Sequence, residues 1–82
     1  MRIIRRYANR KFYDTEQSGY VTLPDLAKTI RDGIEMRVVN YETDKDITST
    51  ILCEILLDQV RRGMPATVAG LRRIIVSGLP VE

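Results

Sequence analysis

The first thirteen residues combine cationic and aromatic side chains in a pattern suited to binding a polyanion. They include five cations and no acid, with three aromatic residues among them. The cations are Arg2, Arg5, Arg6, Arg10 and Lys11, and the aromatic residues are Tyr7, Phe12 and Tyr13. A guanidinium group can grip phosphate oxygens through two parallel hydrogen bonds, and a nearby ring can stack on a base or fix the backbone that bears the arginine. The pattern predicts a nucleic-acid ligand.

The rest of the chain does not share this basic character. The net charge is only +2, because residues 14–60 contain ten acids and four bases. A basic terminus is often no more than a solvated edge, but the opposite sign of the two segments favours nucleic-acid binding. The predicted contact residues are Arg2, Arg5, Arg6, Tyr7, Asn9, Arg10, Lys11 and Tyr13, among which Arg5, Arg6, Asn9 and Arg10 are candidates for reading base edges.

The composition argues against catalysis and against a bound cofactor. Histidine is absent, which removes the commonest general base and metal ligand. Cys53 lies in an aliphatic run, which is typical of a core or interface thiol in a reducing cytoplasm. The sequence contains no glycine-rich phosphate loop and no apolar run long enough to cross a bilayer. We therefore expect a cytoplasmic protein that is not an enzyme and has no metal, cofactor or membrane segment.

The basic residues are predicted to lie on a β-ribbon. Residues 2–7 and 11–14 read as two short strands around a bend, where Asn9 tolerates a left-handed backbone. Neither face of the first strand is purely apolar, so an edge position or a free arm is expected for it. Tyr20 and Val21 continue the extended pattern after a second bend at Ser18 and Gly19.

Helical signals follow the ribbon. Thr22 and Asp25 have the spacing of a capping pair, and they predict a helix over about 23–32. A further strand is expected over 36–41, a long helix over 47–62 and a last helix over 66–77. Arg72 and Arg73 on this last helix are either ordinary exposed residues or a second phosphate-contacting patch. The fold class is therefore α+β, in one small domain.

The long helix carries a wider apolar face than one small layer requires. A chain of 82 residues buries a marginal core, and self-association is a common way to bury more apolar area. We expect a homodimer whose interface residues are Ile51, Leu52, Ile55, Leu56 and Val60.

Two sequence strings carry a family resemblance. The string RRYANRKFYDTEQSGYVTLPDLAKTIRDG, with VVNYETDKDITSTILCEIL after it, resembles the N-terminal DNA-binding domain of the polyhydroxyalkanoate (PHA/PHB) synthesis repressor, or accumulation regulator. The matching positions are Arg6, Tyr7, Asn9, Arg10, Phe12, Tyr13, Asp14, Thr15, Ser18, Tyr20, Val21, Thr22, Leu23, Leu26, Asp46, Ile47 and Thr48. Ala8 replaces the usual proline, and Tyr41-Glu42 stands where many relatives have Asp-Ala.

The resemblance implies a bacterial transcriptional repressor that binds double-stranded DNA. It places a regulator-like DNA-binding domain at residues 1–63 and a helical extension of the same unit at 64–82. Longer relatives continue into a C-terminal region associated with granule or polymer sensing, and this chain ends where that region would begin. Control by the polyhydroxyalkanoate polymer is therefore not expected of it.

Two other functions fit the same residues. A protein-interaction or assembly module could use the basic end to dock an acidic partner. A single-strand or RNA-binding module could use Tyr7, Phe12, Tyr13 and Tyr20 as stacking platforms. For Tyr20, packing against an aromatic residue on the neighbouring strand is favoured.

Overall fold

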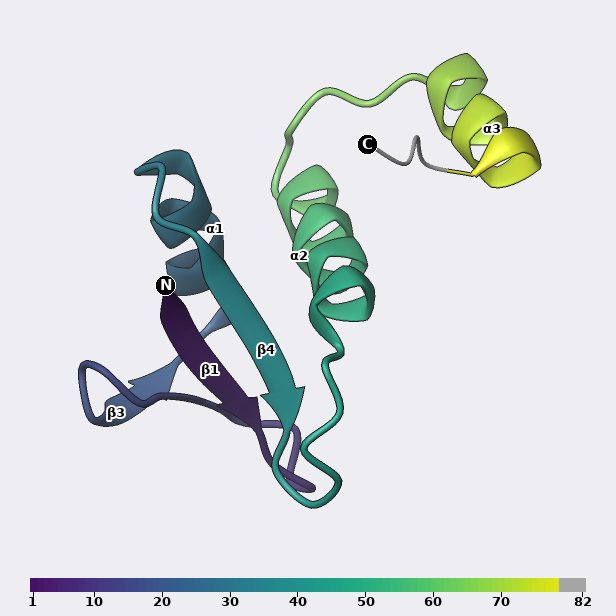
Figure 1. The fold of residues 1–82 in the computed structure, drawn as a ribbon. Helices are drawn as coiled ribbons and strands as arrows, with labels where there is room; N and C mark the ends of the chain where they lie inside the picture. The colour runs from purple at the N-terminus through teal and green to yellow at the C-terminus, as the bar shows by residue number, and fades with distance from the viewer. Residues whose placement is uncertain (79–82) are drawn as a thin grey trace.

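A computed structural model describes residues 1–78 of the chain (Figure 1). Within that range, the strands and helices follow one another in the order β1, β2, β3, α1, β4, α2, α3. The strands are β1 (Arg2–Arg6), β2 (Phe12–Asp14), β3 (Gly19–Val21) and β4 (Met36–Asn40), and the helices are α1 (Leu23–Arg31), α2 (Thr48–Arg61) and α3 (Val68–Ser77). The predicted α+β class is confirmed, and the helices and strands lie close to their expected bounds.

The four strands form one sheet in the order β3-β2-β1-β4. β1 pairs antiparallel with β2 and parallel with β4, so it occupies an interior position. The prediction of an edge strand or free arm was therefore wrong. The mixed polarity of β1 is tolerated in the interior because Ile4 enters the core, while Arg2 and Arg6 on the same face find carboxylate partners.

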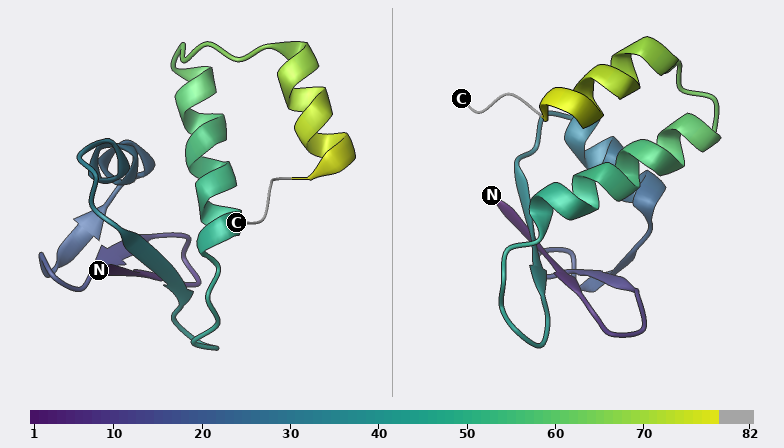
Figure 2. Two further views of the ribbon diagram at one scale, coloured as in Figure 1. Left: turned by 45° about the horizontal axis from the view of Figure 1, so that its top comes forward. Right: turned by 90° about the vertical axis from the view of Figure 1, so that its right-hand side faces the viewer.

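The hydrophobic core lies between one face of the sheet and two helices. Its buried residues come from the sheet, from α1 and from α2, and they are Ile4, Phe12, Val38, Leu26, Ala27, Ile51 and Ile55. Figure 2 shows α1 and α2 beside the sheet, with α3 set apart from it. Since side chains alternate along a strand, the residues next to Ile4 and Val38 point to the opposite face, which neither α1 nor α2 covers.

Local hydrogen bonds fix the starts of α1 and α2. The Thr22 hydroxyl accepts from the Asp25 backbone N–H at 3.3 Å, and the Asp25 carboxylate accepts from the Thr22 N–H at 2.8 Å. This is the predicted capping box, and the hydrogen bonds that the Thr22 N–H and hydroxyl donate to the Asp25 carboxylate lower the pKa of Asp25. Before α2, Asp46 accepts from the Thr48 N–H at 2.9 Å, and the Thr48 hydroxyl accepts from the Val38 N–H at 2.9 Å. The second pair ties the helix start to β4.

Helix α3 begins with a side-chain cap but packs little against the rest of the domain. The Thr67 hydroxyl accepts from the Gly70 N–H at 3.0 Å. Within the described part of the chain, α3 has no buried residue, and Val68 and Ile75 are 75% and 82% exposed. Residues 79–82 of the predicted extension lie outside the described residues. Among residues 1–78, no helix combines the length and apolar character needed to cross a membrane.

Candidate nucleic-acid interface

A tight hairpin at residues 7–11 joins the first two strands and carries part of the basic cluster. The Tyr7 N–H donates to the Lys11 carbonyl at 3.0 Å, and the Arg10 N–H donates to the Tyr7 carbonyl at 2.9 Å. Arg10, with φ of 66°, takes the left-handed conformation that was predicted for Asn9. The Asn9 side chain instead accepts from the Lys11 N–H at 3.1 Å. Three-residue hairpin loops commonly place their last residue in this region, which explains the difference.

Two of the five cations that were predicted to contact nucleic acid form ion pairs within the domain instead. The Arg2 Nε lies 3.2 Å from a Glu16 carboxylate oxygen and 3.6 Å from one of Asp14. The Arg6 Nη1 donates to Glu54 on α2 at 2.8 Å, and its guanidinium carbon lies 4.7 Å from the Phe12 ring centroid. These two arginine side chains are only 14% and 15% exposed. Their charges are largely neutralised, so they are poorly placed to meet phosphate.

The other three cations have different surroundings. Within residues 1–78, Arg5, Arg10 and Lys11 form no ion pair, and all three are exposed. The Lys11 ammonium lies 5.3 Å from the centroid of the Tyr20 ring. A cation over an aromatic ring is attracted electrostatically and still presents its other side to solvent. These three side chains are the part of the basic cluster that can accept an external anion.

Arg5 lies on the uncovered face of the sheet, among tyrosines. Register places it opposite Tyr13 on β2, and Tyr13 opposite Tyr20 on β3. The Tyr7 and Tyr41 rings are stacked with centroids 4.3 Å apart, and Tyr7 also meets Tyr13 edge to face at 6.4 Å. We call the four tyrosines and Arg5 the tyrosine face. Three of the predicted nucleic-acid contact residues therefore lie together on this face, namely Arg5, Tyr7 and Tyr13.

The sequence did not predict that Tyr41 would belong to the tyrosine face, and it predicted the packing of Tyr20 only in part. Tyr20 does pack across strands on Tyr13, with centroids 5.5 Å apart, yet it stays 62% exposed. Tyr41 reaches Tyr7 because the parallel pairing of β4 with β1 continues past Arg6, whose carbonyl accepts from the Tyr41 N–H at 2.9 Å. The only local signal for it was that a tyrosine ends the strand predicted over 36–41.

The predicted dimer residues separate into two groups. Ile51 and Ile55 are buried in the core of their own chain, at 1% and 5% exposure, so assigning them to an intermolecular surface was wrong. They lie on the helix face that meets the sheet. Leu52 and Leu56 are 41% and 42% exposed on the neighbouring face, and Val60 is half-buried.

Cys53 was expected at a core or interface position, and the core alternative is wrong. It is exposed beside Leu52 and Leu56 on α2. In the described part of the chain, no group of three or more metal-ligating side chains comes together.

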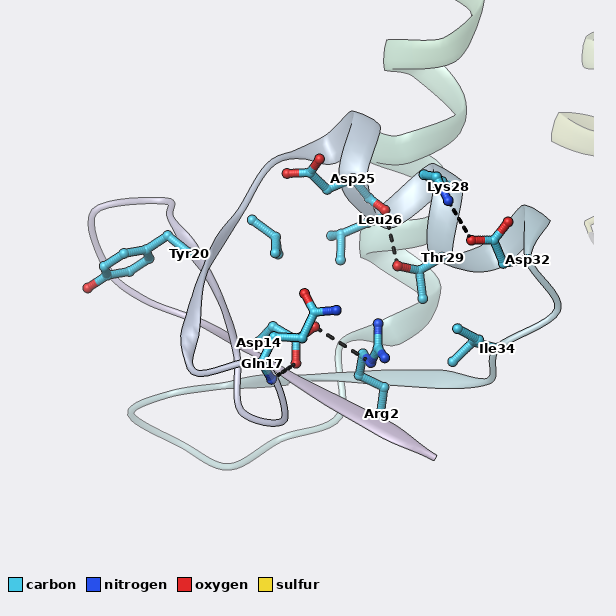
Figure 3. A pocket seen from close by; sticks show the side chains of 11 residues that line it. Arg2, Asp14, Gln17, Tyr20, Asp25, Leu26, Lys28, Thr29, Asp32 and Ile34 are labelled. Carbon is cyan, nitrogen blue, oxygen red and sulfur yellow. Dashed lines mark hydrogen bonds and ion pairs between the residues drawn. The ribbon is translucent and has the colours of Figure 1, made fainter.

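A separate hollow lies between β1, β2 and α1 (Figure 3). Four of its charged side chains form pairs, since Arg2 meets the buried Asp14 and Lys28 meets Asp32 at 2.8 Å, while Asp25 is hydrogen-bonded to Thr22. Asp14 also accepts from two backbone N–H groups, of Glu16 and Gln17, at 2.9 and 3.1 Å. The polar groups of this hollow therefore stabilise the domain.

Comparison with known proteins identifies a family of DNA-binding domains. Residues 3–63 match the family model described as the PHB/PHA accumulation regulator DNA-binding domain. An uncharacterized protein of Allochromatium vinosum is 40% identical over 92% of this chain and 49% of its own length. An uncharacterized protein in the phbA 5′ region of Thiocystis violacea is 39% identical over 92% of this chain and 54% of its own length.

The chain thus spans about half the length of these curated relatives. No solved structure matches it significantly. The family match covers β1 from Ile3 onward, the other three strands, α1 and α2. The chain belongs to the family of PHB/PHA accumulation regulator DNA-binding domains.

Proposed function

We propose that this chain is the DNA-binding unit of a transcriptional repressor and that it binds duplex DNA as a homodimer in the cytoplasm. The observation that carries the proposal is the trio Arg5, Arg10 and Lys11, which are exposed and lack ion-pair partners within residues 1–78. Cations without internal partners gain most from meeting phosphate, because binding releases the counterions condensed on DNA. The proposal sets Arg2 and Arg6 apart as structural residues.

Exposed apolar side chains on the helices support self-association. Leu52 and Leu56 on α2 are 41% and 42% exposed, and Ile30 on α1, which is 40% exposed, lines one apolar groove with them. A contiguous apolar surface of this kind marks an interaction site on a small soluble domain. An isolated helix as short as α3 is marginal in water, so a packing partner for its apolar face would stabilise it. A second copy supplies the same faces and doubles the cationic surface.

An electrophoretic mobility shift with random-sequence duplex DNA at low salt tests the binding. The wild-type chain should shift the duplex, and a variant with Arg5, Arg10 and Lys11 all changed to alanine should not. The matched control replaces Lys28, Arg31 and Arg62 by alanine, which removes the same charge from the helices. This control should still shift the duplex.

The outcomes separate the proposal from its rivals. If the wild type does not shift the duplex in dilute buffer, the DNA-binding proposal is contradicted and a protein-interaction module is favoured. Equal loss in both triple variants would show that net charge alone matters and would contradict the assigned site. Circular dichroism of each variant checks that the fold is retained.

A further inference from the structure

The uncovered sheet face has a specific order of side chains. Across β3, β2 and β1, the aligned residues Tyr20, Tyr13 and Arg5 form one row, since the register pairs them in that sequence. Arg5 is therefore the cation at the end of a row of aromatic side chains, on an interior strand. Lys11 reaches the same row by lying over the Tyr20 ring.

The tyrosine rings are engaged with one another, which argues against stacking on bases. Tyr7 stacks on Tyr41 and meets Tyr13 and Tyr20 edge to face, and Tyr13 meets Tyr20 edge to face. A base inserted between these rings would have to break contacts worth about 1 kcal/mol each. Single-strand binding proteins rely on accessible ring faces. The arrangement favours a duplex read from its edges.

The phenol hydroxyls remain available for such a duplex. Among residues 1–78, none of the four tyrosine hydroxyls forms a hydrogen bond to the protein. Tyrosine hydroxyls commonly donate to phosphate oxygens in DNA complexes. Tyr20, which is 62% exposed and has Lys11 beside it, is the best placed to do so.

Charge decides which side of the face meets DNA. Beyond β4, the turn after Tyr41 contains the exposed acids Glu42 and Asp44, and Arg37 on β4 is paired with Asp46 at 3.2 Å. These acids would repel phosphate. The major groove, about 12 Å wide, admits a two-stranded β-ribbon, and β2 and β1 form such an antiparallel pair, with β3 beside it at the groove wall.

We propose that the outer face of β3, β2 and β1 enters the major groove of duplex DNA, with Arg5 as the side chain that reads a guanine. Tyr20 and Lys11 then contact the phosphates along one wall of the groove. Arginine binds guanine through two hydrogen bonds, to O6 and N7, and this contact is the commonest specific one in the major groove. The inference rests on the proposed function, because it assigns the element that performs the binding.

The experiment begins with selection of bound sequences from a random duplex pool by the 82-residue chain. The selected duplex is then prepared with 7-deazaguanine at the required guanine, which removes the N7 acceptor. We expect the wild type to lose roughly tenfold in affinity on this DNA, in line with the discrimination of a bidentate contact. Arg5→Ala should bind about ten- to a hundredfold more weakly than wild type and should no longer respond to the 7-deazaguanine substitution.

Tyrosine-to-phenylalanine variants test the orientation, because they remove a hydroxyl and keep the ring contacts. Tyr20→Phe should weaken binding several-fold without changing the selected motif, whereas Tyr41→Phe, on the acidic side, should bind like wild type. Lys28→Ala on α1 is the matched cation control and should also bind like wild type. Thermal unfolding of every variant establishes that each is folded at the assay temperature.

Each result has a defined consequence. Wild-type chain that fails to bind any duplex contradicts the proposed function itself. If Arg5→Ala binds the selected duplex as tightly as wild type, or still responds to 7-deazaguanine, the proposed function stands and the sheet-face assignment is overturned. A selected motif without a required guanine, or tighter binding to the single strands than to the duplex, also overturns it.

Discussion

Arg6 on β1 and Glu54 on α2 form a 2.8 Å salt bridge that joins the sheet to the long helix. The arginine is 15% exposed and the glutamate 32% exposed at their side chains, so the pair is partly shielded from solvent. The same guanidinium lies over the Phe12 ring, which is itself part of the core. An arginine that looks like a DNA contact in the sequence therefore stabilises the fold.

Arg6→Ala is expected to lower the free energy of unfolding by about 2 kcal/mol, because it removes a charge-assisted hydrogen bond and a cation–π contact. Urea denaturation followed by circular dichroism measures this change. DNA affinity of the folded variant should stay within about twofold of wild type, since the lost charge was already paired.

A double-mutant cycle with Glu54→Ala isolates the pair. The coupling energy should be about 1 kcal/mol, typical of two groups in direct contact. A coupling energy near zero would show that the 2.8 Å contact contributes nothing to stability. A large loss of DNA affinity in folded Arg6→Ala would instead show that Arg6 contacts DNA.

Replacing Arg10 by glycine should weaken DNA binding without lowering the stability of the fold. Its left-handed backbone, with φ of 66°, costs an ordinary residue roughly 1–2 kcal/mol. In Arg10→Gly, relief of this strain offsets the entropy that glycine adds to the unfolded chain, about 0.4–1 kcal/mol. We expect a melting temperature equal to or above that of wild type together with weaker DNA binding. Differential scanning calorimetry and the mobility shift measure the two effects, and a lower melting temperature would contradict the strain argument.

Binding should also depend steeply on salt. Arg10 and Lys11 in each of two copies neutralise about four phosphates, which gives a slope of roughly −4 for log affinity against log salt. Fluorescence anisotropy over a series of salt concentrations measures this slope. Arg10→Gly in both copies should make it shallower by about 2. A wild-type slope near −2 would mean that only one of these two cations in each copy reaches phosphate.

The sequence predicted the local features of this fold well because their signals are local. Thr22 and Asp25 are three residues apart, and their capping bonds depend on little else. The hairpin at residues 7–11 and the apolar faces of the helices are set by similarly short spacings. The order of the sheet was not predictable in this way. The parallel pairing of β1 with β4 requires a crossover through α1. The sequence of β1 does not indicate which strand will pair with it.

The candidate site was predicted in part for the same reason. A basic, aromatic N-terminus identifies the segment that would face an anion, but it cannot tell a free arginine from a paired one. Arg6 and its partner Glu54 are 48 positions apart, so the loss of Arg6 from the interface depends entirely on tertiary packing. Ile51 and Leu52 illustrate a further limit. Both belong to the apolar stripe of α2, yet only the fold shows which one the sheet has already buried.

Self-association through α2 gives a prediction of its own. Leu52 and Leu56 are exposed on one side of the helix, so glutamates at both positions would place charge in an apolar contact. Analytical ultracentrifugation should find a dimer for wild type and a monomer for Leu52→Glu/Leu56→Glu. Thr50→Glu changes an exposed residue on the opposite flank of the same helix and should remain dimeric. A wild-type monomer at high protein concentration would contradict the expected homodimer.

The pKa of Asp25 makes the α1 cap sensitive to acid. Backbone and side-chain hydrogen bonds from Thr22 lower the pKa of this carboxyl below its unfolded value. The carboxylate therefore adds its full contribution above the unfolded pKa, about 3.9, and that contribution is lost as the pH falls through the lower folded pKa. Asp25→Ala should lower the melting temperature by a few degrees at pH 7, as removal of a helix cap does.

The difference between wild type and Asp25→Ala should shrink as the pH falls below the unfolded pKa of about 3.9, because the unfolded chain then binds a proton at Asp25 more readily than the folded chain does. Thermal unfolding of both proteins at pH 7, 5 and 3 measures this. The difference should be the same at pH 7 and 5, since the carboxylate is ionised at both values. A difference that persists unchanged at pH 3 would mean that the capping bonds do not depend on the charge of Asp25.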